Sequence, residues 1–266
     1  MLHLKFALNL ENLADEMIDA ISASWKNPFV CPIVVFPDPK LEQWFRLRWI
    51  QKKGALTGLS TMMIDRFLME ILVGEDSSKK KLSADMLCNV ILAYLKMNDD
   101  GEPNYLKLGD EVRRYLVIED SVGNAQLDET HLFDFAQKIA SLFLEYETSR
   151  PRDFAKNSDG STAYGILDKW KQGALQPFFA SNPKGDIAVR EKWQQKLYSA
   201  IFHQHGNEDS LLTKVFKAEA DRKQDDQITY LTIPFLYYSC FDENGKANFH
   251  LEKIQDQPLF IFGLSG

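Results

Sequence analysis

The sequence lacks a long apolar run, a secretory leader pattern and a pairable set of cysteines. Its apolar stretches fall well short of the roughly 20 residues that span a bilayer. The first residues have neither the charged segment nor the cleavage site of a signal peptide. Cys31, Cys88 and Cys240 lie far apart among apolar residues, which is typical of reduced, buried thiols. We therefore expect a cytoplasmic protein with no membrane segment.

Glycine and lysine are missing where a nucleotide-binding loop would need them. After a weakly alternating strand pattern at residues 3–8, the chain continues Asn9-Leu10-Glu11-Asn12-Leu13. A phosphate-cradling loop uses glycines, so that backbone N–H groups can approach the anion, and a lysine at the start of the helix. Glu11 would instead repel a phosphate. We expect no nucleotide hydrolysis at this point and no cofactor.

Metal ligands and nucleophiles also lack the required spacing. The last strand runs into Phe262-Gly263-Leu264-Ser265, which supplies no acid for magnesium. His203 and His205 stand two residues apart without a supporting cysteine or carboxylate cluster. The sequence contains no Gly-x-Ser-x-Gly elbow, and Glu191-Lys192 and Glu252-Lys253 do not fit a metal-nuclease motif. We expect neither catalytic residues nor a metal site.

The most informative segment that is present is a strand, a turn and a helix. Residues 33–36 form an apolar, β-branched run, Pro37 and Pro39 end it, and an amphipathic pattern continues to about Lys53. Weaker versions occur at residues 4–21 and at the final strand, residues 259–262. Parallel α/β sheets need helices on both faces, so the final strand without a following helix predicts a fragment truncated after Gly266.

The remaining patterns divide the chain into three parts. An α/β core is expected at residues 1–75 and a mainly helical insertion at residues 76–227. A hairpin and return strand are expected at residues 228–266, since Asn244-Gly245 lies between two strand-like runs, 228–240 and 247–254. Within the insertion, helical spacing covers residues 84–97, 105–116, 129–148, 186–203 and 210–220.

Charge leaves the question of a nucleic-acid contact open. The net charge of −7 argues against a chain coated by nucleic acid. One helix-sized window, residues 40–53, nevertheless holds five basic residues and a single acid, Glu42. Such a cluster fits either a solvated helix face or a local phosphate contact. Its basic residues are Lys40, Arg46, Arg48, Lys52 and Lys53.

Two side chains in these patterns are candidates for ligand contact. Gln43 lies near the carboxyl end of a strand, where open α/β sheets bind ligands, whereas the neighbouring Trp44 is typical of a core position. Arg150 closes the long helix, where it can pair with the helix dipole, reach a phosphate or stack on a base.

Three stretches, taken in order, form a recognisable pattern. They are Val34-Val35-Phe36 through Leu41-Glu42-Gln43-Trp44 and Gln51-Lys52-Lys53-Gly54 to Ile64-Asp65-Arg66-Phe67, then Lys138-Ile139-Ala140-Ser141-Leu142-Phe143 through Tyr146 to Arg150-Pro151, and Phe260-Ile261-Phe262-Gly263-Leu264-Ser265. Together they resemble the N-terminal region of the RecC family, the gamma subunit of exodeoxyribonuclease V. The resemblance implies a degenerate superfamily-one helicase-like, P-loop-type parallel sheet core that lacks the phosphate loop and carries a large, mainly helical insertion.

This resemblance implies a non-catalytic subunit of a RecBCD-type helicase–nuclease that acts in recombination and double-strand break repair. Its partners would be RecB-like and RecD-like motor subunits and forked or single-stranded DNA. The subunit would split the duplex, channel the 3′-ended strand and scan it for the Chi octamer. By resemblance, Gln43, Met63, Leu142 and Arg150 fall at DNA-binding positions.

Several positions depart from the family's recognition set. The family has polar residues where Pro37 and Pro39 stand, an aromatic where Met69 stands, and acids where Ser141 and Leu144 stand. Proline offers no N–H, and methionine stacks less well than an aromatic ring. We expect single-strand contact together with altered or absent Chi reading.

Two other function classes remain open. A protein-interaction scaffold without DNA contact agrees with the acidic overall charge, although the basic window at residues 40–53 speaks against it. An active ATP-dependent helicase or nuclease would need a phosphate loop or an acidic metal cluster. An ATPase assay and the salt dependence of single-strand binding separate these alternatives.

Overall fold

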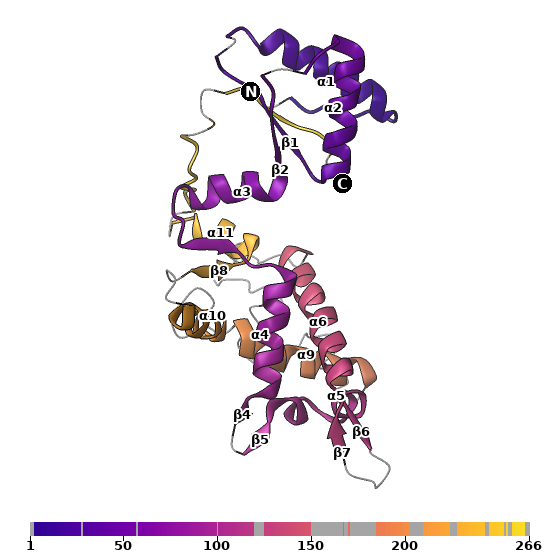
Figure 1. The fold of residues 1–266 in the computed structure, drawn as a ribbon, viewed down its shortest axis with the longest axis vertical. Coiled ribbons are helices and arrows are strands. Elements are labelled where there is room, and N and C mark those ends of the chain that lie inside the picture. Colours follow the sequence, from indigo (N-terminus) through magenta and orange to yellow (C-terminus); the bar gives the residue numbers. More distant parts are fainter. Residues whose placement is uncertain are drawn as a thin grey trace, which may run out of the picture. The chain divides into compact units, whose positions relative to one another are not determined.

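The computed structural model describes residues 3–27, 29–56, 58–99, 101–119, 125–149, 167, 170, 185–202, 210–223, 228–242, 245–252, 254 and 257–263. The chain is a mixed α/β protein with small parallel sheets (Figure 1). It divides into two compact units, Met1–Glu75 with Ser239–Gly266 and, between them in sequence, Asp76–Tyr238. Across the described ranges, we find no helix that is long and apolar enough to cross a membrane.

A three-stranded parallel sheet forms the centre of the first unit. Its order is β2-β1-β9, with β1 (Ile33–Phe36) between β2 (Ser60–Met63) and β9 (Leu259–Ile261). Ile33 pairs with Ser60 on one side and with Leu259 on the other. All four residues of β1 are buried, as is usual for a parallel strand covered on both faces. The buried strand predicted at residues 33–36 is confirmed.

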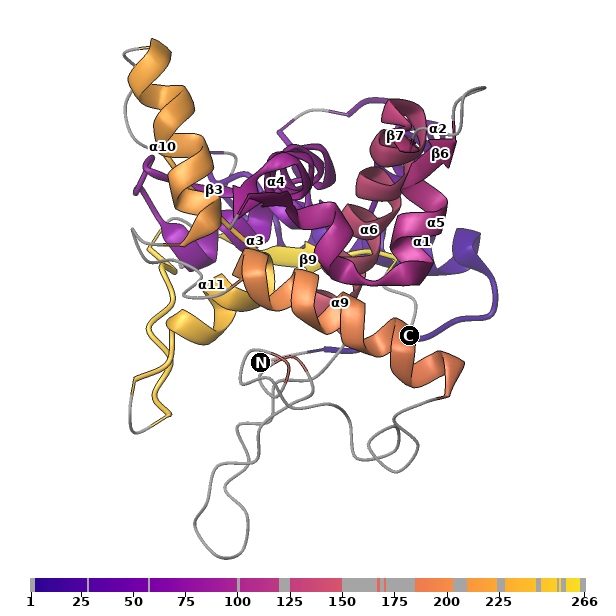
Figure 2. The same ribbon diagram turned by 90° about the horizontal axis from the view of Figure 1, so that it is seen from below.

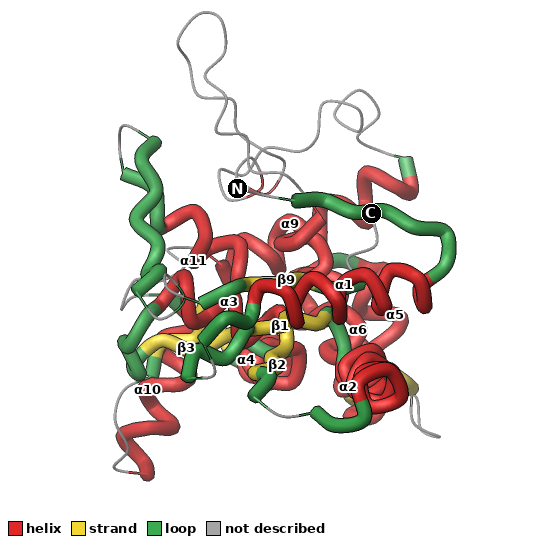
Figure 3. The backbone as a smooth tube through the Cα atoms, turned by 90° about the horizontal axis from the view of Figure 1, so that it is seen from above, coloured by secondary structure: helices red, strands yellow, loops and turns green. Residues whose placement is uncertain are grey.

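Helices cover both faces of this sheet (Figures 1 and 3). Helices α1 (Leu10–Ser24) and α2 (Pro39–Lys53) pack over the face that carries Val34 and Phe36. Helix α3 (Ile64–Val73) packs through Phe67 on the opposite face, with Ile33 and Val35. Successive side chains of a strand point to opposite faces, so a run of four apolar residues supplies both cores.

Residues 3–8 do not form the predicted strand, and that prediction was wrong. They adopt no regular structure, and Phe6 is 91% exposed. A strand needs a neighbour for its backbone hydrogen bonds, and residues 3–8 pair with none of the described strands. Regular structure begins where the Asn9 side chain accepts hydrogen bonds from the amides of Glu11 and Asn12 and caps α1.

The second unit is mainly helical (Figure 2). Helices α4 and α6 pack along each other, and one apolar cluster joins them to α5, α9 and α10. The elements are β3 (Lys79–Lys81), α4 (Ala84–Lys96), β4 (Asn98–Asp99), β5 (Glu102–Pro103), a 3-10 helix η1 (Asn104–Leu108), α5 (Asp110–Leu116), β6 (Val117–Glu119), β7 (Ala125–Leu127), α6 (Glu129–Ser149), α9 (Asp186–Phe202), α10 (Leu211–Lys223), β8 (Thr229–Leu231) and α11 (Ile233–Ser239).

The long strand predicted at residues 228–240 was wrong beyond Leu231. β8 pairs in parallel with β3, and α11 follows at once. The Thr232 hydroxyl accepts a hydrogen bond from the Phe235 amide at 3.3 Å and starts this helix, with Pro234 in its first turn. Of the expected hairpin, the described residues form one bridge, between Phe241 and Ala247.

The helix predicted at residues 105–116 is two helices. Gly109, with φ of +119°, separates η1 from α5. Two short antiparallel pairs, β4 with β5 and β6 with β7, were not predicted. Such strands are too short for an alternating pattern to mark them.

Candidate nucleic-acid interface

The carboxyl ends of the three parallel strands meet at one edge of the sheet. Phe36 is the last residue of β1 and pairs with Met63, the last residue of β2. On the other side of β1, Val35 pairs with Ile261, two residues before Gly263. This edge is where open α/β sheets bind their ligands, and α2 begins here, three residues after Phe36.

The turn between β1 and α2 is fixed by side-chain capping and close packing. The Asp38 carboxylate accepts hydrogen bonds from the amides of Lys40 and Leu41, both at 2.9 Å, and Pro39 takes the first helical position. Gly263 lies against this turn, because a Cβ built there would stand 2.1 Å from Leu41 Cδ2. Pro37 and Pro39 therefore belong to a rigid helix start beside the end of β9.

The residues given a DNA-binding role by resemblance lie in both units. Gln43 is exposed on α2, and half-buried Met63 packs against the apolar cluster that contains Phe36. Leu142 belongs to α6 in the second unit, and Arg150 lies outside the described residues. A hollow on α6 is lined, among the described side chains, by Gln137, Lys138, Ser141, Leu142 and Glu145. Gln43 and Met63 thus share one unit, and Leu142 belongs to the other.

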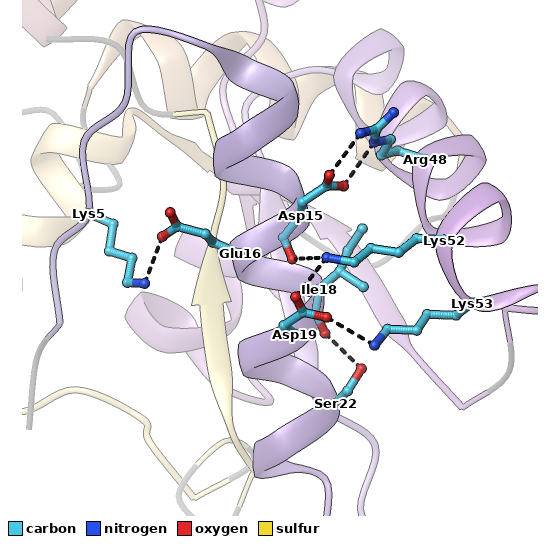
Figure 4. Close-up of polar contacts among 9 residues, drawn as sticks. All are labelled: Lys5, Asp15, Glu16, Ile18, Asp19, Ser22, Arg48, Lys52 and Lys53. Atoms are coloured by element: carbon cyan, nitrogen blue, oxygen red, sulfur yellow. Dashed lines mark hydrogen bonds and ion pairs between the residues drawn. The ribbon is translucent and has the colours of Figure 1, made fainter.

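The basic face of α2 is neutralised by α1 (Figure 4). Arg48 donates to both carboxylate oxygens of Asp15, at 2.9 and 2.8 Å. The Lys52 ammonium contacts the Asp15 carbonyl and an Asp19 carboxylate oxygen, both at 2.7 Å. Lys53 contacts the other oxygen of Asp19 at 3.0 Å. These three cations already have anionic partners, so they do not form a free phosphate-binding surface.

The pKa values of these groups shift in the direction that paired charges require. The hydrogen bond from Arg48 lowers the pKa of Asp15, and the same bond raises the pKa of Arg48. Hydrogen bonds from Lys52 and Lys53 lower the pKa of Asp19. Both carboxylates are therefore stabilised in their charged form.

A second polar group connects α2 to β2. Thr61 Oγ1 donates to Glu42 and accepts from Arg46, whose guanidinium also lies 2.8 Å from the Glu42 carboxylate. Of the five basic residues of this window, Lys40 alone has no ion pair in the described ranges. The charge argument for DNA contact at α2 therefore rests on Lys40.

Sequence reasoning missed the acids that pair with α2. Asp15 and Asp19 are four residues apart on α1, and Arg48 and Lys52 are four apart on α2. Residues at this spacing share one helix face, so the two patterns match when the helices pack side by side. This complementary spacing is visible in the sequence and could have predicted the pairing. No group of three or more potential metal-ligating side chains comes together in the described parts of the chain.

These features define a mixed α/β protein in which a small parallel sheet carries a ligand-type edge and a mainly helical unit lies between its strands in sequence. Residues 2–265 match the family model described as RecC, N-terminal domain. The chain belongs to the RecC family, which makes it a RecBCD-type subunit in DNA repair. No curated protein matches the sequence significantly.

Proposed function

We propose that this chain is a non-catalytic, DNA-handling part of a RecBCD-type helicase–nuclease. With RecB-like and RecD-like motor subunits it would split the duplex and guide the 3′-ended single strand. The observation that carries the proposal is the edge where β1, β2 and β9 end together beside the start of α2. In this proposal, that edge of the sheet contacts the DNA strand and belongs to a degenerate helicase-like, P-loop-type core.

The two helix starts near this sheet favour DNA handling over nucleotide hydrolysis. The first amides of α2 already donate to Asp38 and those of α1 to Asn9, with Glu11 in the first turn. Free amides at a helix N-terminus are what a phosphate group needs. In both helices the first amides donate to a side-chain oxygen, and a carboxylate lies close to each helix N-terminus.

Single-strand contact in this proposal involves exposed Gln43 and half-buried Met63 in the first unit, and Leu142 and Arg150 of the second. A glutamine amide can hydrogen-bond to bases, and apolar side chains can pack on their faces. Pro37 and Pro39 cannot donate through their backbone, and Met69 replaces an aromatic. We therefore propose that the chain binds the DNA single strand but that its recognition of the Chi octamer differs from the family's usual one.

The test uses the assembled complex with this chain carrying Gln43→Ala and Arg150→Ala. Fluorescence anisotropy of labelled single-stranded DNA should report several-fold weaker binding than the parent complex. Gln51→Ala is the matched control, because Gln51 is also exposed on α2 but lies two turns further from the strand ends. Identical titration curves for the parent and the double variant would refute the strand contact.

A protein-interaction scaffold is the second candidate, and the pairing of Arg48, Lys52 and Lys53 with α1 favours it. Co-purification of the full-length protein with the products of neighbouring genes tests both readings. A motor–nuclease partner together with salt-sensitive DNA binding supports the first proposal. A partner without any DNA binding supports the scaffold. ATP turnover by the isolated chain would refute both.

A further inference from the structure

Residues 3–8, here called the 3–8 strap, expose three apolar side chains that alternate along the chain. Phe6 is 91% exposed, and Leu4 and Leu8 are exposed as well. Side chains two residues apart point to the same side of an extended segment, so the three form one apolar face. Contiguous apolar surface is rarely left open to water. The strap therefore carries a face that fits against another apolar surface.

The first unit offers such a surface at the outer edge of β9. This strand pairs with β1 on one side, and no described strand pairs with its other edge. Leu259 and Ile261 pair with Ile33 and Val35, so their side chains lie on the face of the sheet that packs against α3. Both remain partly exposed, whereas β1 beside them is fully buried. An apolar strand with an open edge is a template for a further strand.

The ion pairs between α1 and α2 fix the direction in which the strap would run. Asp15 pairs with Arg48, and Asp19 pairs with Lys52, so both partners advance by four residues together. Helix α1 therefore runs in the same direction as α2, which begins at the edge where β1 ends. The strap leads directly into α1 and must end at that same edge. A strand formed by the strap would thus be parallel to β1 and β9.

The handedness of crossover connections selects the edge of the sheet. Connections between parallel strands of one sheet are right-handed in about 98% of cases. Helices α1 and α2 cover the same face, and two connections of one hand on one face step along the sheet in the same direction. Helix α2 leads from β1 to β2, so α1 must reach β1 from the side of β9. Because β9 already occupies that side of β1, the place left for the strap is the outer edge of β9.

An ion pair already holds the strap close to α1. Lys5 donates to a Glu16 carboxylate oxygen of this helix at 2.7 Å (Figure 4). Since Lys5 points toward the face covered by α1, its neighbours Leu4 and Phe6 would point to the opposite face. The exposed apolar side chains of β9 lie on that opposite face. The alternation of the strap and the register of β9 therefore match.

We propose that the 3–8 strap closes on the outer edge of β9 as a fourth parallel strand, giving the order β2-β1-β9-strap. In the present structure the strap is open. Its closure would satisfy the free backbone groups of β9 and block this edge against another chain. It would also bring Leu8 and Asn9 to the edge where the other three strands end. The inference does not depend on the proposed DNA-handling function.

Amide hydrogen exchange of the full-length protein, read by mass spectrometry, tests the closure. Strap peptides should exchange slower in the parent than in a Phe6→Glu variant by about tenfold or more, because closed amides exchange only through local opening. Peptides that cover β9 should lose protection in the same variant. Phe29→Glu is the matched control, because Phe29 is 93% exposed in the same unit and lies outside the strap. It should leave both regions as slow as in the parent.

Unchanged exchange of α2 peptides shows that the Phe6→Glu variant is folded, as expected for a residue that is exposed when the strap is open. Fast exchange of the strap in the parent protein would overturn the inference, as would equal effects of Phe6→Glu and Phe29→Glu. Protection that grows with protein concentration would mean that a second copy occupies the edge of β9, and closure within one chain would then be wrong. None of these outcomes requires DNA, so the proposed function is tested separately.

Discussion

Arg48 of α2 and Asp15 of α1 form a two-pronged ion pair, with hydrogen bonds of 2.9 and 2.8 Å. The planar guanidinium fits both oxygens of a carboxylate at once. Together with the contacts of Lys52 and Lys53 to Asp19, the pair joins the two helices that cover one face of the sheet. Most of the positive side chains of α2, the most basic helix of the first unit, are thus paired with carboxylates of the same chain.

We expect the Asp15→Asn, Asp19→Asn variant to change the acid stability of the protein. Both carboxyls have pKa values lowered by folding, so they contribute stability that is present above their unfolded pKa of about 3.9. That contribution is lost as the pH falls through the lower folded pKa values. The variant should be less stable than the parent at neutral pH and should lose less on acidification.

Urea unfolding followed by tryptophan fluorescence at several pH values checks this expectation. Glu16→Gln is the control on the same helix, because Glu16 pairs with Lys5 where both side chains are more than half exposed. Such exposed pairs contribute little. A pH dependence that is the same in parent and double variant would contradict the role given to the two acids.

Phe45 is expected to be critical for the core of the first unit. Its side chain is fully buried and packs against Phe36 and Phe262, with ring centroids 5.3 and 5.1 Å apart. Phe45→Ala should lower the free energy of unfolding by about 3–5 kcal/mol. Leu47→Ala on the same helix, where the side chain is 55% exposed, should change it by about 0.5 kcal/mol or less. Similar values for the two variants in denaturant titrations would contradict this packing.

Gly263 is expected to tolerate no side chain, for two reasons that can be separated. Its φ is +81°, and a Cβ would meet Leu41 Cδ2 at 2.1 Å. Gly245 has a similar φ of +76°, and a Cβ built there meets no atom of the described residues within 4 Å. Gly245→Ala should therefore cost about 1–2 kcal/mol for the backbone alone, and Gly263→Ala clearly more.

Adding Leu41→Ala to Gly263→Ala separates the clash from the backbone cost. Removal of the Leu41 side chain should recover part of the loss caused by Gly263→Ala, and the remainder should resemble that of Gly245→Ala. Thermal and denaturant unfolding measure all three variants. Equal costs for the two glycine substitutions would show that β9 does not approach α2 as closely as the structure indicates.

The parts of the fold that could be predicted from the sequence are those where a residue pattern favours a single local structure. The buried strand at residues 33–36 and the start of α2 at Pro39 were of this kind, because a β-branched apolar run and a proline in the first helical turn are local signals. The strand predicted at residues 3–8 was wrong, because an alternating pattern becomes a strand only when a neighbouring strand takes up its backbone hydrogen bonds, and these residues pair with no described strand. The segment after Leu231 failed because Thr232 and Pro234 start a helix within an aromatic run that also suits a strand.

The site was harder to predict than the fold because its electrostatics are long-range in sequence. Residues 40–53 hold five basic residues and one acid, yet the partners of Arg48, Lys52 and Lys53 lie on α1, 33 or 34 residues earlier. Local charge counting therefore overstated the free charge of α2.

A buried carboxylate in the second unit leads to the last prediction. Glu147 on α6 accepts hydrogen bonds from the Tyr198 hydroxyl of α9 and from Thr232 Oγ1 at 2.8 Å. All three residues are buried, and leaving a buried acceptor without its donor costs about 1–3 kcal/mol. Tyr198→Phe should therefore destabilise the protein by about that amount, although it removes a single oxygen atom.

Tyr115→Phe is the control. Because Tyr115 is 40% exposed, water can take the place of its hydroxyl group in the variant. It should leave the unfolding free energy almost unchanged. Tyr198→Phe combined with Thr232→Val should cost a different amount from the sum of the single variants, because both donors serve one carboxylate. Denaturant unfolding of the four proteins measures this coupling. Strict additivity, or a neutral Tyr198→Phe, would mean that Glu147 does not link α6 and α9 to the start of α11.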